Sequence, residues 1–191
     1  KAAPLIFEVR GLPESKTVND RSQYMGAKVG VIIHCEHGHM TIPDYSSAQV
    51  FDNDGKQIKE FTSKIQGSDA HFANLLGAVR SRNYKDLNAD IEEGHLSSAL
   101  CHTGNISYRL GKEAKPEEMA AFVKNERGGT DAYERMLEHL EKNDVSLKDY
   151  PITLGPALTM NPRTERFTNN ADANAMLTRK YRKPFVVPKK V

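Results

Sequence analysis

The stretch VGVIIHCEHGHMTI, residues 29–42, decides how the first part of the chain folds. The run from Val29 to Cys35 is apolar and rich in β-branched residues, and every second residue of it would lie on one face of a strand. Gly38 can adopt the positive φ of a tight turn, and Met40 begins a second apolar segment. The stretch therefore predicts a strand, a turn and a second strand.

The same stretch carries three histidines and a cysteine within IHCEHGH, residues 33–39. Cys and His are the usual zinc ligands, and His-rich tracts can bind metals. A zinc site normally takes two spaced pairs of ligands, whereas Cys101 and His102 are adjacent and lie in a predicted helix. We therefore expect no metal here. An enzyme that works independently, through a metal held by HCEHGH or through His95 and His102, stays an alternative.

The bulk composition is that of an ordinary globular chain. Its 191 residues suit one domain, residues 1–191, and 38% hydrophobic with 27% charged residues exclude a disordered or membrane-spanning class. No apolar run approaches the roughly 20 residues of a membrane helix. A formal net charge of +2 gives no electrostatic reason to expect nucleic-acid binding, although the tail 179–190 is basic. We expect no nucleic acid and no membrane as partners.

Strand patterns dominate the first sixty residues. LIFEV, residues 5–9, alternates apolar and polar, and Asn53-Asp54-Gly55 between two apolar–polar runs is a strong hairpin signal. These patterns predict four or five antiparallel strands. Because the chain enters its first strand almost at once and shows no signal peptide, we expect it to be a piece of a longer protein.

Helix patterns follow from residue 68 onward. Four helices are predicted: one after Ser68 or Asp69, one from Asn88 or Asp90 to Gly111, one from Pro116, and one from Thr130 or Asp131. The last forty residues return to extended patterns. Strands, then helices, then strands predict an α+β fold: an open, largely antiparallel sheet with helices packed on one face.

Several motifs that would identify an enzyme do not occur in these 191 residues. There is no G-x-G-x-x-G, no G-x-x-x-x-G-K-[ST], no G-x-S-x-G and no H-E-x-x-H. Cys101 and His102 are neighbours on a predicted helix, so their side chains diverge by about 100° and do not form a nucleophile–base pair.

One polar constellation remains, on the helix predicted from Glu92 to Leu110. Its members recur at intervals of three and four residues and so share one face: His95, Ser98, His102, Asn105 and Arg109. An ordinary solvated face is rich in Lys and Glu, whereas this one has short polar groups and imidazoles, which suits a cleft wall. His95, His102, Asn105 and Arg109 are therefore the candidates for a substrate cleft. A solvated face, or groups that cap neighbouring loops, is the alternative.

Residues 71–111, HFANLLGAVRSRNYKDLNADIEEGHLSSALCHTGNISYRLG, resemble the C-terminal domain of bacterial Gfo/Idh/MocA-family NAD(P)-dependent oxidoreductases. The segment GVIIHCEHGHMTIPDYSSAQVFDNDGKQIKEF, residues 30–61, is also similar to that family. So is the ending, in which ANAMLTRKYRKPFVVP follows ITLGPAL. The resemblance covers nearly the whole chain.

The resemblance implies a C-terminal α+β domain in which helices cover one face of the sheet and the other face forms a homo-oligomer. It implies a parent enzyme that acts with NAD or NADP on a sugar or cyclitol. The family's N-terminal dinucleotide-binding domain is absent, and its glycine-rich loop and Glu-Lys-Pro motif have no match here. No catalytic or cofactor-binding residue of the family can therefore be assigned to a position in this sequence. We expect the fragment to bind no cofactor and to be inactive alone.

Two other functions stay open at this point. The chain could be a stand-alone binding or assembly module without enzymatic activity, or it could belong to an NAD-dependent glycosidase, because some members of the family cleave glycosidic bonds. The identity of the substrate, the choice between NAD and NADP, and a location in the bacterial cytoplasm or periplasm do not follow from the sequence.

Overall fold

The computed structural model describes residues 3–64 and 68–188. It divides into two compact units. The first comprises Lys1–Glu93 and Asp131–Ser146, and the second comprises Gly94–Thr130 and Leu147–Val191. The four longest strands come first, most of the helices follow, and every described strand pair is antiparallel, which confirms the predicted α+β class.

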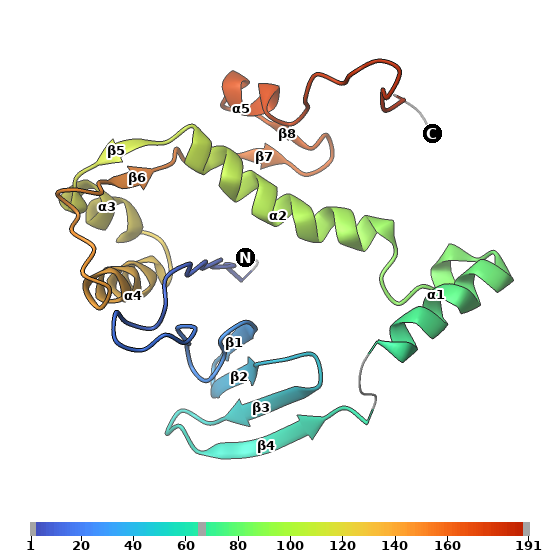
Figure 1. Cartoon of the computed structure of the whole chain (residues 1–191), viewed down its shortest axis with the longest axis horizontal. Coiled ribbons are helices and arrows are strands. Elements are labelled where there is room, and N and C mark those ends of the chain that lie inside the picture. The colour runs from blue at the N-terminus through green and yellow to red at the C-terminus, as the bar shows by residue number, and fades with distance from the viewer. Residues whose placement is uncertain (1–2, 65–67, 189–191) are drawn as a thin grey trace. The chain divides into compact units, whose positions relative to one another are not determined.

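The first unit contains a four-stranded antiparallel sheet (Figure 1). Its strands are β1 (Val31–Cys35), β2 (Gly38–Ile42), β3 (Ser47–Phe51) and β4 (Gln57–Thr62), hydrogen-bonded in that order. The predicted strand–turn–strand at 29–42 is β1 and β2. The predicted hairpin at Asn53-Asp54-Gly55 joins β3 to β4, where the Asp52 amide donates to the Lys56 carbonyl at 3.0 Å. Both hairpins are confirmed.

The strand predicted at residues 5–9 is wrong, because residues 3–11 form neither helix nor strand. Leu5, Phe7 and Val9, which would have formed its apolar face, are 64%, 66% and 79% exposed. A strand needs a neighbour to take its backbone hydrogen bonds, and the described strands pair only with one another. Alternation in the sequence could not show that a partner is lacking.

One face of the sheet is apolar and exposed. The register places apolar side chains on it together with Lys59, whose ammonium lies 4.6 Å from the centre of the Phe61 ring. We call the larger apolar residues of this face the apolar sheet face: Val31, Ile33, Met40, Ile42, Val50 and Phe61. Val31 is 52% exposed, and Ile33 and Phe61 are each 44% exposed. Within the first unit this face therefore has little cover.

The opposite face of the sheet is partly covered by the chain that precedes β1. Thr41, on β2, is 1% exposed and its hydroxyl donates to the Met25 carbonyl at 3.1 Å. Tyr24 and Ala27 form an isolated antiparallel bridge beside it, and Ala27 is buried. The described contact that buries Thr41 thus comes from a loop, not from a helix.

Helix α1 (Asp69–Ser81) begins where the sequence predicts and leads into a short 3-10 helix, η1 (Tyr84–Asp86). The Asn74 side chain joins the two by donating to the Asp86 carbonyl at 2.6 Å and accepting from the Asn88 amide at 3.0 Å. The apolar residues that share one face of α1 are exposed: Phe72, Leu75, Leu76 and Val79 have exposed fractions from 48% to 56%. Only Ala78 of this helix is buried.

Helix α4 (Gly129–Glu141) contacts the segment that precedes β1, residues 3–30, which we call the N-terminal arm. Arg135 and Arg10 both donate to the Glu8 carboxylate, Arg10 at 2.6 Å. The Arg135 guanidinium also lies 4.2 Å from the centre of the Tyr24 ring, within the range of a cation–π contact. One helical residue thus binds the arm through both charge and an aromatic ring.

Acidification should weaken this attachment in two steps. Burial, with the positive charges of Arg10 and Lys142, lowers the pKa of His139. Burial raises the pKa of Glu8, but its hydrogen bonds and charge pairing with Arg135 and Arg10 outweigh burial and leave that pKa lowered. A group whose pKa is lower in the folded state than in the unfolded state contributes its full stabilisation at pH values above its unfolded-state pKa. That stabilisation is lost as the pH falls through the folded-state pKa.

We therefore expect the melting temperature to fall as pH drops below about 6.5, where His139 begins to titrate in the unfolded chain, and to fall further below about 4.5 through Glu8. His139→Gln should remove the first step and leave the second. The matched control, His71→Gln on the exposed face of α1, should keep both steps. An unchanged first step in His139→Gln would refute the assignment.

The second unit is built around α2 (Ile91–Arg109), most of which belongs to it. The other elements are β5 (Lys112–Ala114), α3 (Pro116–Val123), β6 (Ile152–Leu154), β7 (Met160–Asn161), β8 (Arg166–Phe167) and α5 (Ala171–Ala175). Strands β5 and β6 pair antiparallel, as do β7 and β8. The predicted return to extended structure is therefore present but short.

The core of the second unit lies where α2 meets β8 and α5. Ile106, Phe167 and Ala173 are buried, and five partly buried apolar residues surround them: Leu110, Leu158, Met160, Met176 and Leu177. The Asn174 side chain fixes β8 against α5, because it accepts from the Phe167 amide at 2.9 Å and donates to the Phe167 carbonyl at 2.7 Å.

Candidate functional site

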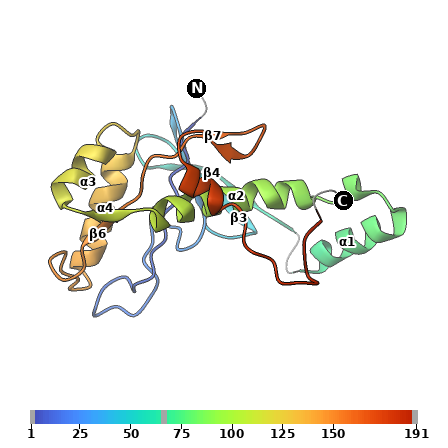
Figure 2. The same cartoon turned by 90° about the horizontal axis from the view of Figure 1, so that it is seen from above.

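Helix α2 is the scaffold of the predicted site and runs as one continuous helix in both views (Figures 1 and 2). Asp90 caps its start by accepting from the amide of Glu92 at 2.8 Å, as the sequence predicts. Acidic residues in the first turn and Arg109 in the last suit the helix dipole. Near its end, Ser107 donates to the Pro156 carbonyl at 2.8 Å and ties the helix to the chain before β7.

The candidate residues His95, His102, Asn105 and Arg109 are all exposed on α2. Their spacing of three and four residues places the last three along one face. Among the described residues, the side chains of His102, Asn105 and Arg109 have no hydrogen-bond or ion-pair partner. For these three side chains, the alternative that they cap neighbouring loops has no contact to support it. Their hydrogen-bond donors remain available to a ligand.

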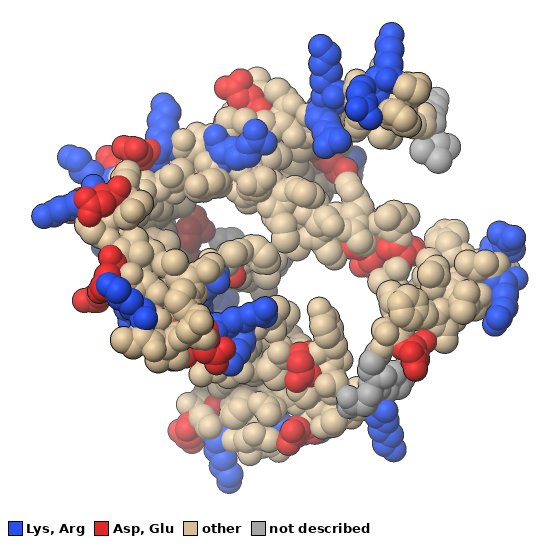
Figure 3. All heavy atoms as spheres, in the orientation of Figure 1, with Lys and Arg blue, Asp and Glu red and all other residues tan. Residues whose placement is uncertain are grey.

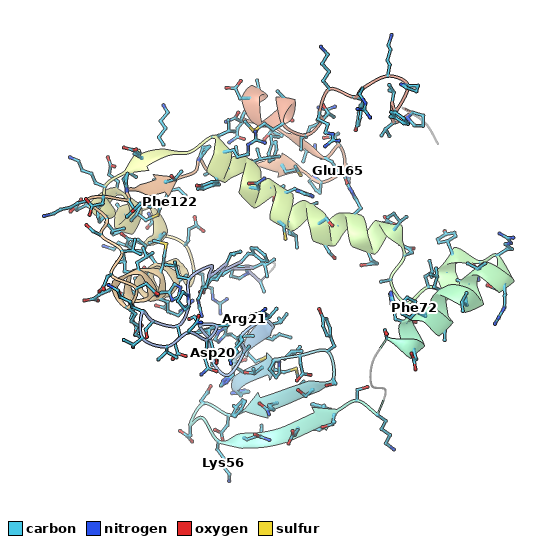
Figure 4. The ribbon with its side chains drawn as sticks, viewed as in Figure 1. Asp20, Arg21, Lys56, Phe72, Phe122 and Glu165 are labelled. Atoms are coloured by element: carbon cyan, nitrogen blue, oxygen red, sulfur yellow. The ribbon has the colours of Figure 1, made fainter. Side chains whose placement is uncertain are left out.

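His95 differs from the other three candidates because it has a partner. Its Nε2 atom lies 2.8 Å from Oε1 of Glu165, and each side chain is about half exposed. Glu165 lies in the turn between β7 and β8, beside α2 (Figure 4). Its φ of +50° is unusual for a residue with a side chain, and its amide donates to the Asn161 carbonyl at 2.8 Å.

This pairing was missed by sequence reasoning. Glu165 is 70 residues from His95, and the run NPRTER around it shows only a turn. Asn161 shapes that turn, because its side chain accepts from the Arg163 amide at 2.9 Å. The turn thus positions one carboxylate at the start of the polar stripe and leaves His102, Asn105 and Arg109 unpartnered.

The histidines of the β1–β2 hairpin are arranged by the register of its strands. His34 lies opposite His39, whereas Cys35 alternates to the other face of the sheet. Within residues 3–64 and 68–188, no group of three or more His, Cys, Asp or Glu side chains is placed to hold a metal ion. Both cysteines are free and exposed.

The surface charge is mixed. Basic and acidic side chains are interspersed on the face shown in Figure 3, and basic ones gather on the segment that follows α5. None of the helices in the described ranges is both long enough and apolar enough to cross a bilayer.

Comparison of the chain with protein-family models, with curated proteins and with solved structures gives no match. The chemistry of the site is therefore judged from its own side chains. An amide, a guanidinium and an imidazole can all donate hydrogen bonds to hydroxyl groups. Because His102 has no described carboxylate partner to orient it as a base, the stripe suits binding better than proton transfer.

Proposed function

We propose that this chain is the C-terminal, substrate-side and oligomerisation domain of an NAD(P)-dependent oxidoreductase that acts on a sugar or cyclitol. The family resemblance of residues 71–111 and 30–61 supports the proposal. NAD or NADP belongs to the full-length protein, and the domain alone is inactive because the phosphate-binding glycine loop is missing from this sequence.

The observation that carries the proposal is the part of the α2 stripe formed by His102, Asn105 and Arg109, whose side chains are exposed and have no partner among the described residues. Residues 71–111, where the resemblance is most specific, form α1 and α2, so the stripe lies within the most family-like segment. Sugars and cyclitols present hydroxyl groups in a ring, and side chains of the kinds at His102, Asn105 and Arg109 bind such groups. A free row of these donors is consistent with one wall of a carbohydrate site.

In the complete protein, His102→Ala and Asn105→Ala should each raise KM or lower kcat by about tenfold or more, which is near 1.4 kcal/mol. Melting temperatures should change little, because both side chains are exposed and unpartnered. The matched control is Cys101→Ser, which changes an exposed neighbour on the same helix. Steady-state kinetics and thermal unfolding of the three variants separate the outcomes. Lower melting temperatures with unchanged kinetic constants would make the stripe structural and contradict the proposal.

The apolar sheet face supports the second half of the proposal, a homo-oligomer through the open side of the sheet. Exposed apolar area of this kind commonly marks an interface. A symmetric dimer would cover the same patch on both copies at once. The patch lies on regular strands whose register fixes which side chains face outward, so it offers a defined surface for a second copy.

We expect the chain to be a dimer or tetramer in solution, and Ile33→Lys to shift it toward monomer because the lysine would place a charge in the contact. Tyr45→Lys is the control, since Tyr45 is fully exposed between β2 and β3 and lies outside the apolar sheet face. Light scattering at high concentration measures both. A monodisperse monomer for the unaltered chain would count against this half of the proposal.

A further inference from the structure

The hairpin of β1 and β2 brings together two imidazoles that the spacing of the sequence does not reveal as a pair. His34 and His39 are five positions apart, yet they are direct partners across the two strands. Direct partners in an antiparallel pair have their side chains on the same face and close together. Their ring centres are 6.4 Å apart and their planes are tilted by 39°.

The surroundings leave both rings available to a ligand and hold one of them in place. His39 is stacked on Phe51 of β3, with 4.8 Å between the ring centres and 11° between the planes. Neither imidazole has a hydrogen-bond partner among the described residues. The Asn53 side chain donates to the Glu36 carbonyl at 3.3 Å and links the β1–β2 turn to the β3–β4 turn. His34 is exposed, and exposed side chains change rotamer readily.

Imidazole nitrogen binds divalent transition metals at about 2.0–2.1 Å. Two imidazoles that share one ion therefore have ring centres roughly 5 Å apart. A rotation of His34 about its χ angles, which brings its ring about 1.5 Å closer, would reach that geometry while His39 stays stacked on Phe51. Cys35 lies on the other face of the sheet and does not contribute.

We propose that His34 and His39 form a two-histidine chelate for a divalent transition-metal ion, with water in the remaining coordination positions. The site differs from a structural zinc centre, which needs four protein ligands. It is consistent with a hairpin that folds without metal, because the register of β1 and β2 already places the two histidines opposite each other. The proposal does not depend on the proposed oxidoreductase function.

Titration with Ni²⁺, monitored by calorimetry, tests the site and avoids the oxidation of free thiols that Cu²⁺ would cause at Cys35 and Cys101. We expect one saturable ion per chain. Because the second imidazole binds an ion that is already held nearby, His34→Asn and His39→Asn should each weaken binding by about a hundredfold. His71→Asn, which alters an exposed histidine on α1, is the matched control and should bind as the unaltered chain does.

Circular dichroism of each variant checks that the sheet is intact, since only folded variants test the site. A second series with Cu²⁺, Ni²⁺ and Zn²⁺ on a chain with both cysteines changed to Ser should give the strongest binding for Cu²⁺. Binding that survives both His34→Asn and His39→Asn would place the ion elsewhere and overturn the proposal. Weak binding without a defined stoichiometry would also overturn it, because it would show an adventitious ion only.

Discussion

Phe167→Ala should lower the free energy of unfolding by about 3–5 kcal/mol, the usual cost of emptying a buried aromatic site. Phe167 is 4% exposed and contacts the core that joins α2, β8 and α5. Its backbone amide and carbonyl are both held by Asn174, so the strand cannot easily shift to fill the cavity. Urea denaturation of the variant and the unaltered chain measures the difference.

Phe185→Ala provides the control for Phe167→Ala, because Phe185 lies in the same unit but is 70% exposed. Its substitution should change stability by no more than about 0.5 kcal/mol. If the two variants were equally stable, the core around Ile106 and Phe167 would not be the one that holds this unit together.

Gly38→Ala should have the second large effect, a loss of about 2–6 kcal/mol. A methyl group at Gly38 would lie 1.9 Å from the Phe51 carbonyl oxygen, and the residue has a φ of +144°. Backbone strain at such a φ and forced displacement in a packed region each cost about 1–3 kcal/mol. The added methyl group would push β2 away from β3, where His39 and Phe51 are partners.

Gly55→Ala separates the two causes of the loss at Gly38. Gly55 has a φ of +78°, but a methyl group there meets nothing within 4 Å. This variant should therefore show only the cost of backbone strain, about 1–3 kcal/mol, without the cost of the steric clash. Thermal unfolding followed by circular dichroism compares the two, and an equal loss in both would mean that the close approach to Phe51 does not matter.

Local signals in the sequence predicted much of the fold. The two hairpins depend on residues within a few positions of each turn, such as Gly38 and Gly55, and both formed as predicted. The start of α2 depends on Asp90, which caps it as expected. The strand predicted at 5–9 failed because a strand needs a distant partner, and alternation in one segment carries no information about that partner.

The candidate site was predicted only in part, for the same reason. Helical spacing alone placed His95, His102, Asn105 and Arg109 on α2, and the structure shows all four exposed there. The contact of His95 with Glu165 depends on how a hairpin 70 residues away meets the helix, which no local pattern encodes. The His34–His39 pair likewise depends on the strand register, which places the two residues opposite each other. Spacing along the chain does not determine that register.

The reading frame upstream of Lys1 tests the central proposal most directly, because the proposal requires a dinucleotide-binding domain to be encoded there. Sequencing the transcript that carries this chain should show an open frame that continues upstream. Within the preceding few hundred residues it should encode a strand, a G-x-G-x-x-G loop and a helix, the arrangement that binds a dinucleotide. A start codon directly before Lys1, with a stop codon in frame ahead of it, would contradict the proposal that this chain is part of an oxidoreductase.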